Sequence, residues 1–572
     1  MPRVRRTWIF LAGLTTAQAA WLWAFSTGVY SGPDAAGYYT PARMIAAQGT
    51  MVLRPESSAQ FIGYHWLDGG DGSFHVRYPP GLPTLLAPAY RIGGPAGVRA
   101  LNAVLALAGV VILFLIARRW VPEPLALAGA VASATLPVLN EQALLGFSHV
   151  ATGTIFLGAL LAADIWRERP RALTALAGGF LLGVLPTIRY PAILLALGVG
   201  LYQLGGARTP AHRRSIGLVA LGAALPIGAL LIHHWIVHGS VLETGYALSG
   251  EDRAFGLAYF RRNLFGYIGT LGRNGGAIVL FGTIGMLAML RRSETRARGI
   301  LTLGLAASAS ALYASYYWPG TDIRFLLPVL PLWILGAVAL LDEPESRRWR
   351  RYFLLGFLTL HLLVAIPDGL RRMTRLSDQA NRAAIALAGV RASVPAGSVV
   401  IGPHAVQTQL EPYGEWKLAE WTLLWVGPLP DPGSRAPQSF DVRGRRQHSP
   451  FQVGKADSLR ARYRGLEPEA RLEAVLDDLF LWAEGRGVYW IADEAWIGAV
   501  EPLLTDVARL EPLGRIPPTP SGPDARIPGA GGGFWLPDLP LDVYEVHQVG
   551  ARQIAVMAHG SSKNVQSGKT RE

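Results

Sequence analysis

The 572-residue sequence has no cysteine, only four lysines and little charge of either sign. The missing cysteine excludes disulfides, thiolate catalysis and cysteine-bound metals. Charged residues make up 16% of the chain, whereas a soluble protein usually has about 25%. Hydrophobic residues make up 51%, with 17 Trp, 19 Tyr and 19 Phe among them. This balance predicts a membrane protein.

The positive charge is almost entirely arginine. The 53 basic and 40 acidic residues give a net charge of +13. A nucleic-acid-binding protein would gather its arginines on one domain. Here the arginines come in short groups between apolar runs, as membrane topology requires. We therefore expect membrane lipids as partners and no nucleic acid.

Eleven apolar runs predict membrane spans, although several must borrow turns from flanking residues to reach the roughly 20 residues that a span needs. With the N-terminus in the cytoplasm, the inside segments carry 19 arginines in 43 residues, and the outside connections carry 11 in 130. This contrast is the positive-inside pattern, and it places the C-terminal part outside. The runs fall at about 7–25, 100–117, 121–139, 148–166, 172–187, 191–206, 216–237, 276–290, 299–318, 325–341 and 352–366.

The first apolar run has a second interpretation. The stretch “RVRRTWIFLAGLTTAQA” resembles a signal peptide, with a basic start, an apolar centre and “AQA” in the form of a cleavage site. We favour an uncleaved span because the apolar residues continue through “AWLWAF”.

Two long connections, 26–99 and 238–275, lie on the predicted outer side. The first contains “PDAAGYYTPARMIAAQG”, whose apolar spacing predicts an amphipathic helix lying in the membrane surface. Gly49 is expected to end that helix, and Pro79-Pro80-Gly81 stops any helix that precedes it.

The C-terminal region has a different character. Residues 367–559 predict a small α/β or α+β domain outside the cytoplasm. We expect a strand in “AGSVVIGPH”, a strand–turn–helix–strand unit in “GVYWIADEAWIGAVEPLLTDVARLEPLGRI” and a last strand near “LDVYEVHQV”. Residues 560–572 are expected to be a disordered tail.

The order of these features resembles the membrane glycosyltransferases of the GT-C type. The shared features are a first span, a large outer loop that opens with an acidic residue and an interfacial helix, a Pro-Pro turn, many spans with short loops, an “R-aromatic-L-L-P-x-L-P” span and an outer domain. Residues 1–366 most resemble the relatives of the dolichyl-phosphate-mannose–protein mannosyltransferases and of the lipid A aminoarabinose transferases. The resemblance implies a polytopic GT-C-like fold. It also implies an inverting transfer of a sugar from a polyprenyl phosphate to an acceptor hydroxyl.

Four residues take their expected roles from this resemblance. Asp34 stands where the family keeps its first-loop catalytic carboxylate, although from the residues alone its plainer role is to cap the helix that follows. In “RYPPGLP” the family has a basic residue before Pro-Pro, near the lipid phosphate; here Tyr78 precedes the prolines and Arg77 is one place further back. Arg324, in “DIRFLLPVLP”, is implied to contact phosphate, with Phe325 in place of the family's tyrosine.

Four further candidates lie in outer connections or at the outer edges of spans. Glu141 is an acid at a membrane edge and a catalytic candidate, with a solvated loop carboxylate as the alternative. Arg189 occupies a minimal outer turn, where it contacts phosphate or snorkels to headgroups. Tyr246 lines the sugar site or anchors the chain in the interface. His149 is a substrate-ligand candidate, although a lone histidine is more often a hydrogen-bonded helix end.

With this resemblance, the sequence implies a glycosyltransferase of a bacterial inner membrane. Its donor is a sugar on polyprenyl phosphate, and its acceptor is a glycan, a lipid or a protein. The sequence assigns no cofactor and leaves a divalent metal open. The alternatives are a multispan transporter or lipid flippase, a membrane anchor for the outer domain, and a polysaccharide polymerase or ligase. A transporter usually shows paired repeats, which we do not find in this sequence.

Overall fold

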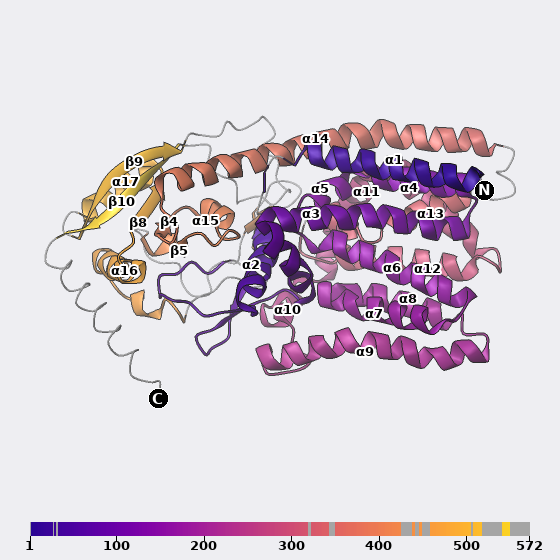
Figure 1. The fold of residues 1–572 in the computed structure, drawn as a ribbon, viewed down its shortest axis with the longest axis horizontal. Coiled ribbons are helices and arrows are strands. Elements are labelled where there is room, and N and C mark those ends of the chain that lie inside the picture. Colours follow the sequence, from indigo (N-terminus) through magenta and orange to yellow (C-terminus); the bar gives the residue numbers. More distant parts are fainter. Residues whose placement is uncertain are drawn as a thin grey trace.

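A bundle of helices and a mixed α/β region follow one another along the long axis of the computed structural model (Figure 1). The long helices of the bundle run roughly along that axis, and the sheet of the C-terminal region lies beyond one end of them. The structure describes residues 2–26, 28–29, 33–63, 65–318, 322–342, 349–424, 438–440, 446–448, 458–504, 507–516 and 540–549. The predicted tail at 560–572 lies outside these residues.

A helix coincides with each of the eleven predicted runs. Within the described ranges, five helices are long and apolar enough to cross a membrane, and the two halves of α11, bent by 104°, make a sixth if they count as one span. Four more helices are apolar but shorter, so a multi-pass membrane protein is confirmed and the number eleven stays a prediction. The helices are α1 (Pro2–Ala24), α3 (Gly81–Trp120), α4 (Glu123–Ala134), α6 (Ser148–Glu168), α7 (Ala172–Ile188), α8 (Ile193–Leu204), α9 (Pro210–His238), α11 (Leu257–Leu290), α12 (Arg296–Ala314), α13 (Leu330–Leu340) and α14 (Arg350–Ser393).

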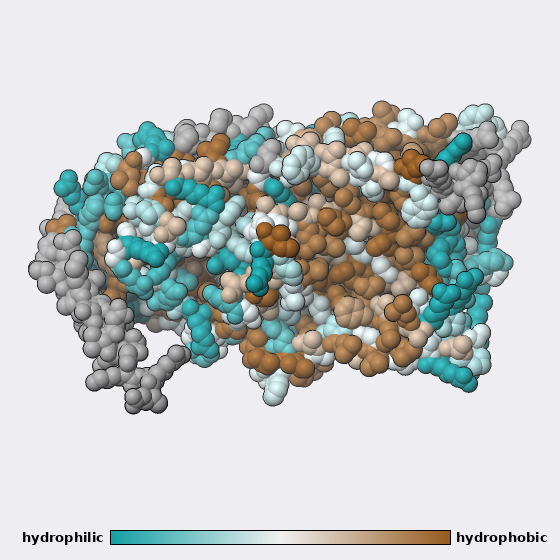
Figure 2. Space-filling view, viewed as in Figure 1, coloured by the Kyte–Doolittle hydropathy of each residue, from teal (hydrophilic) through white to brown (hydrophobic). Residues whose placement is uncertain are grey.

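The surface of the bundle matches a position in lipid. Figure 2 shows hydrophobic residues over most of its visible side, with hydrophilic residues on the C-terminal region and at the opposite end. Exposed side chains of α9 such as Leu225, Trp235 and Ile236 contribute to this apolar surface. In water such a surface would mark an aggregation-prone patch, but in a bilayer it needs no partner.

Short elements gather at the end of the bundle that faces the C-terminal region. The predicted surface helix is α2 (Pro33–Gln48), and Gly49 follows it with a φ of 71°, as a helix-ending glycine does. The small antiparallel sheet β1-β3-β2 was not predicted, because its strands have only two or three residues. The remaining elements are β1 (Val52–Leu53), β2 (Trp66–Asp68), β3 (Phe74–Val76), α5 (Pro137–Ala143), η1 (Tyr190–Ala192), α10 (Gly245–Leu248), η2 (Glu251–Ala254) and η3 (Ile323–Leu326).

Helix α3 begins at Gly81, directly after the two prolines, and changes direction within its length. Gly93 and Gly94 have non-helical backbone angles, and the φ of 55° at Gly94 lies in the region that favours glycine. The stretch after this break enters the bundle core, where Val110, Leu113 and Phe114 are fully buried.

The C-terminal region contains a five-stranded sheet of order β5-β4-β8-β10-β9. Strand β4 pairs in parallel with β5 and β8, whereas β10 pairs antiparallel with β8 and β9. All the predicted strands are present, and α14 runs unbroken past residue 367, where we expected the domain to begin. The elements are β4 (Val399–Ile401), α15 (His404–Leu410), β5 (Lys417–Ala419), η5 (Trp421–Leu424), β6 (Gln438–Phe440), β7 (Arg446–His448), η6 (Ala461–Tyr463), α16 (Pro468–Ala483), β8 (Val488–Ala492), α17 (Glu494–Leu504), β9 (Ala508–Ile516) and β10 (Leu541–Gln548).

The C-terminal region is joined to the first loop by backbone hydrogen bonds. The amide of Phe61 donates to the carbonyl of Leu418 at 2.7 Å, and the amide of Glu420 donates to the carbonyl of Ala59 at 2.8 Å. The hydroxyl of Tyr90, on α3, donates to the carbonyl of Pro412 at 2.6 Å. The loop is therefore clamped between the bundle and the sheet edge at β5.

The close approach of α11 and α13 gives a test of the bundle packing. A Cβ built at Gly285 would lie 1.9 Å from the carbonyl oxygen of Gly336, whereas a Cβ at Gly304 would meet nothing within 4 Å. We expect Gly285→Ala to force the helices apart and to destabilise the protein by about 1–3 kcal/mol. Gly304→Ala, the matched control, should be neutral or slightly stabilising. Thermal unfolding in detergent measures both, and equal midpoints would contradict the packing.

Candidate active site

A cavity of about 530 Å³, part of it open to solvent, lies where the bundle meets the short elements. Of the eight residues predicted for the site, seven line it: Asp34, Arg77, Tyr78, His149, Arg189, Tyr246 and Arg324. They come from α2, the segment after β3, the start of α6, the α7–η1 turn, α10 and η3. The other lining residues are Tyr38, Phe147, Ser148, Glu251, Tyr316, Tyr317, Trp318 and Phe325.

Asp34 lies in the first turn of α2, and its carboxylate faces the cavity. Oδ2 lies 3.0 Å from Nη2 of Arg324, and Oδ1 accepts a hydrogen bond from the Tyr78 hydroxyl at 3.2 Å. Burial alone would raise the pKa of this carboxyl, but the Arg324 guanidinium and the other polar groups around it lower the pKa below its ordinary value. Asp34 is therefore a carboxylate at neutral pH, and 34% of its side chain remains exposed.

Arg77 is buried and fully engaged. Its Nη1 donates to Oε2 of Glu251 at 3.2 Å, and its Nε donates to Nδ1 of His65 at 3.1 Å. The second oxygen of Glu251 accepts from the Tyr316 hydroxyl at 2.6 Å. The charge of Arg77 is thus neutralised within the protein. Its pairing with Glu251 stabilises the fold and leaves less of its charge available for binding a substrate.

Arg324 has two carboxylate partners. Besides Asp34 it contacts Asp322, whose Oδ2 lies 2.9 Å from Nε of the arginine. Oδ2 of Asp322 also accepts from the indole of Trp318 at 3.0 Å. Two acids on one guanidinium hold it in a fixed direction, pointing at Asp34.

Arg189 differs from the other two arginines of the cavity. Its side chain is 7% exposed, and no carboxylate among the described residues lies within ion-pair distance of it. Its neighbours are aromatic rings: Cζ lies 5.4 Å from the ring centre of Tyr313 and 5.1 Å from that of Phe325. Its Nε has no hydrogen-bond partner in the described structure. Its guanidinium also hydrogen-bonds to Tyr313, so part of its hydrogen-bonding capacity is used within the protein. A buried guanidinium without a carboxylate partner is suited to an anionic ligand.

His149 is a second polar side chain of the cavity with unused hydrogen-bonding capacity. The residue is 5% exposed, and neither ring nitrogen has a hydrogen-bond partner among the described residues. Its ring lies 5.5 Å from that of Phe325, between the ends of α6 and η3. Burial of an imidazole without partners is costly unless a ligand supplies them.

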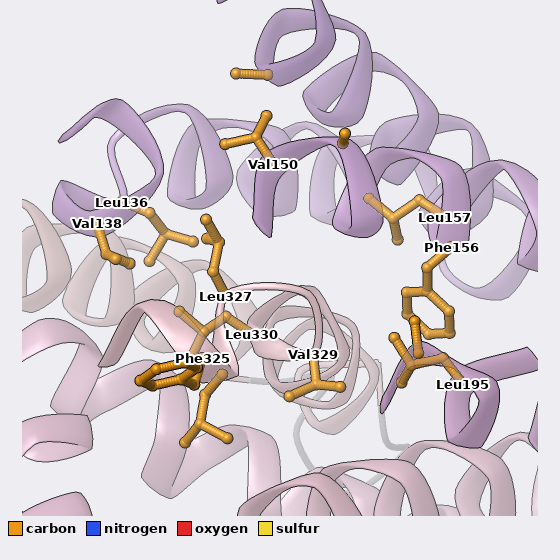
Figure 3. Close-up of a cluster of buried hydrophobic side chains, with 14 of the residues drawn as sticks. Leu136, Val138, Val150, Phe156, Leu157, Leu195, Phe325, Leu327, Val329 and Leu330 are labelled. Carbon is orange, nitrogen blue, oxygen red and sulfur yellow. The ribbon is translucent and has the colours of Figure 1, made fainter. Parts of the chain in front are cut away.

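A second, apolar cavity of about 370 Å³ adjoins the first. The two share Arg189 and Phe325, and the second continues between α6, α8, α12 and α13. Leu195, Phe325 and Val329 line it, and Figure 3 shows these three side chains in the buried apolar cluster of the bundle. The guanidinium of Arg189 therefore lies at the junction of a polar and an apolar cavity.

This architecture has a counterpart among solved structures. The chain superposes on ArnT from Cupriavidus metallidurans in the apo state with a TM-score of 0.56 and 14% identity, over 93% of this chain and 97% of that one. With ArnT bound to undecaprenyl phosphate the TM-score is 0.59 and the identity 13%, over 94% and 97%. The chain has an ArnT-like fold. No family model and no curated protein matches the sequence.

The expected GT-C-like architecture is thereby confirmed at the level of the fold. Glu141 is the one predicted site residue that does not line the cavity of this ArnT-like fold. It lies on α5, and its Oε2 is 2.8 Å from Nη1 of Arg372 on α14. The same guanidinium contacts Asp368 through Nε at 2.8 Å.

Sequence reasoning missed Glu251, which holds Arg77, and His65, which lies 3.6 Å from Asp34. Both lie in outer connections of mixed composition, where nothing separates a buried acid or imidazole from a solvated one. Placement in the two long outer loops was the only available signal. Among the described residues, no group of three or more His, Asp or Glu side chains is arranged to hold a metal ion.

The buried pair of Glu251 and Arg77 can be tested by stability. We expect Glu251→Gln to cost about 3–5 kcal/mol, because it leaves a buried guanidinium without its counter-charge. Glu415→Gln removes the partner of Arg391 in an exposed pair and should cost about 0–1 kcal/mol. The measurement is the thermal midpoint of each purified variant. A Glu251 variant as stable as the Glu415 variant would show that the pair is solvated.

Proposed function

We propose that the chain is an integral membrane glycosyltransferase that moves a sugar from a polyprenyl-phosphate donor to an acceptor hydroxyl, with inversion. The observation that carries this proposal is the junction of the two cavities. A buried cation without a carboxylate partner faces an ionised carboxylate across one cavity and opens onto an apolar cavity on its other side. The phosphate of a lipid phosphate needs a cation, and its hydrocarbon chain needs an apolar cavity. The acceptor hydroxyl needs a carboxylate that can take its proton.

Arg189 is proposed as the main phosphate ligand. Arginine presents several donors in a fixed fork that matches phosphate oxygens. Arg77 and Arg324 are already paired with acids, so their charge is less available, although Arg324 points towards the same space. That ArnT was solved with undecaprenyl phosphate supports a lipid phosphate of this kind. The polyprenyl chain would lie in the apolar cavity.

Asp34 is proposed as the general base. The acceptor oxygen forms a bond to the anomeric carbon while the bond from that carbon to the phosphate oxygen breaks. The hydroxyl proton passes to Asp34, and the polyprenyl phosphate leaves with one more negative charge, which Arg189 stabilises. Because Arg324 lowers the pKa of Asp34, the carboxylate is a weak base while it is paired with this arginine. Proton transfer becomes favourable only when the bound substrate weakens the ion pair or places its own negative charge beside Arg324.

The remaining predicted residues receive supporting roles. His149 and Tyr246 are proposed to bind sugar or phosphate oxygens, and Tyr78 to orient Asp34 through its hydrogen bond. Glu141 lies outside the cavity, so we propose that it acts through Arg372 and fixes α14 against α5. The positive-inside pattern supports a site at the outer face of a bacterial inner membrane, and the acceptor is a glycan, a lipid or a protein.

The decisive experiment is donor consumption by the full-length protein in membranes. We expect the wild type to consume one member of a panel of labelled polyprenyl-phosphate sugars. Asp34→Asn should lower its turnover by about 10²-fold or more, since a general base contributes about 10²–10⁴-fold. The asparagine keeps the size of the aspartate, and Arg324 keeps Asp322 as its counter-charge, so the variant should fold.

Asp71→Asn, in the exposed part of the same loop, is the matched control and should retain full turnover. Equal turnover by the Asp34 and Asp71 variants would contradict the assignment of the base. Consumption of no donor, together with no binding of bare undecaprenyl phosphate, would contradict the proposed function itself.

A further inference from the structure

We infer that the sugar transferred by this protein is uncharged, and that the cavity rejects a sugar that carries an ammonium group. This inference rests on the proposed function and adds the chemical class of the sugar. It separates the chain from ArnT, whose sugar is an aminoarabinose.

The carboxylates near the cavity are already paired with arginines. Among the described residues, Asp34 and Glu251 line the cavity, and each is held by an arginine and by a tyrosine hydroxyl. Asp322 lies behind Arg324, where its oxygens accept from that arginine and from Trp318. An ammonium bound by Asp34 would lie beside Arg324 and would occupy the proposed base. A cationic sugar thus gains no partner of its own.

The aromatic rings of the cavity offer no better site for a cation. An ammonium can bind over a tyrosine or tryptophan face, but here guanidinium groups already take that position. Arg77 lies 5.1 Å from the ring centre of Tyr78 and 5.9 Å from that of Tyr246. Arg324 lies 5.7 Å from Trp318 and 5.1 Å from Phe325. An added positive charge would meet these arginines at short range in a poorly solvated space, which disfavours it.

The polar groups that remain free suit hydroxyls. His149 has two unpaired ring nitrogens, and a neutral imidazole supplies one donor and one acceptor. The Tyr38 hydroxyl bonds to the Ser148 hydroxyl at 3.2 Å at the cavity wall, and each of these groups can also bond to a ligand. A neutral hydroxylated ring finds partners here without any change in the charges of the site.

The test uses matched pairs of donors on the full-length protein. The probes are undecaprenyl-phosphate-linked mannose, glucose and arabinose, each beside an analogue with an amine in place of one hydroxyl. Their affinities are measured by displacement of labelled undecaprenyl phosphate. At pH 7 we expect the amine-bearing member to bind at least tenfold more weakly in every pair. The ratio of the two dissociation constants, amine-bearing over neutral donor, should fall towards one at a pH above the pKa of the amine, because the amine is then uncharged.

A variant tests the cause. Arg77→Gln frees the carboxylate of Glu251, so the ratio of the two dissociation constants, amine-bearing over neutral donor, should fall at least threefold at pH 7. Arg253→Gln, at an exposed position of η2, should leave this ratio unchanged. If the Arg77 variant does not fold, the pH dependence of the wild type decides alone. An amine-bearing donor that binds as tightly as its partner at pH 7, or a ratio that pH does not change, overturns the inference and leaves the proposed function standing. Failure of bare undecaprenyl phosphate and of every donor to bind overturns the proposed function and this inference together.

Discussion

The buried guanidinium of Arg189 is the constraint on which the cavity end of the bundle depends. An ion moved out of water costs several kcal/mol unless charge or hydrogen bonds compensate it. The rings of Tyr313 and Phe325 offset part of this cost. An anion bound at this guanidinium, as proposed above, would offset the rest. The two neighbouring arginines of the cavity are neutralised by Glu251 and by Asp34 with Asp322, so one uncompensated cation is left, at the entrance to the apolar cavity.

The scaffold brings together groups that are far apart in the sequence. Asp34 comes from the start of α2, Arg189 from the break between α7 and η1, and Arg324 from η3, before α13. Each lies where a helix begins or ends, so the polar group faces the cavity at the end of the bundle while the helices beside it stay apolar. The C-terminal region clamps the first loop through the bonds at Phe61 and Glu420, and that loop carries α2. These bonds hold the loop in place, which would fix the distance between the proposed base and the proposed phosphate ligand, as proximity catalysis requires.

The sequence could predict the apolar helices of the bundle and four of the five strands of the C-terminal sheet, but not the short strand β5. With the family resemblance, it also indicated most of the residues predicted for the cavity. Apolar runs and arginine groups are strong signals because lipid and membrane orientation impose them directly. Arg189 stood out for the same reason, as a cation in an outer turn without space for a loop. Glu141 has an equally suggestive position, yet it pairs with Arg372, 231 residues away in the sequence. Glu251 gave no signal, since its partner Arg77 lies 174 residues before it. Such long-range pairs depend on tertiary packing and cannot be predicted from local patterns.

The central claim is that Arg189 anchors a lipid phosphate, and binding of undecaprenyl phosphate tests it most directly. A charged hydrogen bond contributes about 1.5–3 kcal/mol, so Arg189→Gln should bind the lipid roughly 10- to 100-fold more weakly than the wild type. Arg253→Gln, at an exposed position, should bind it like the wild type. If the folded Arg189 variant binds within twofold of the wild type, the phosphate lies elsewhere and the account of the site is contradicted.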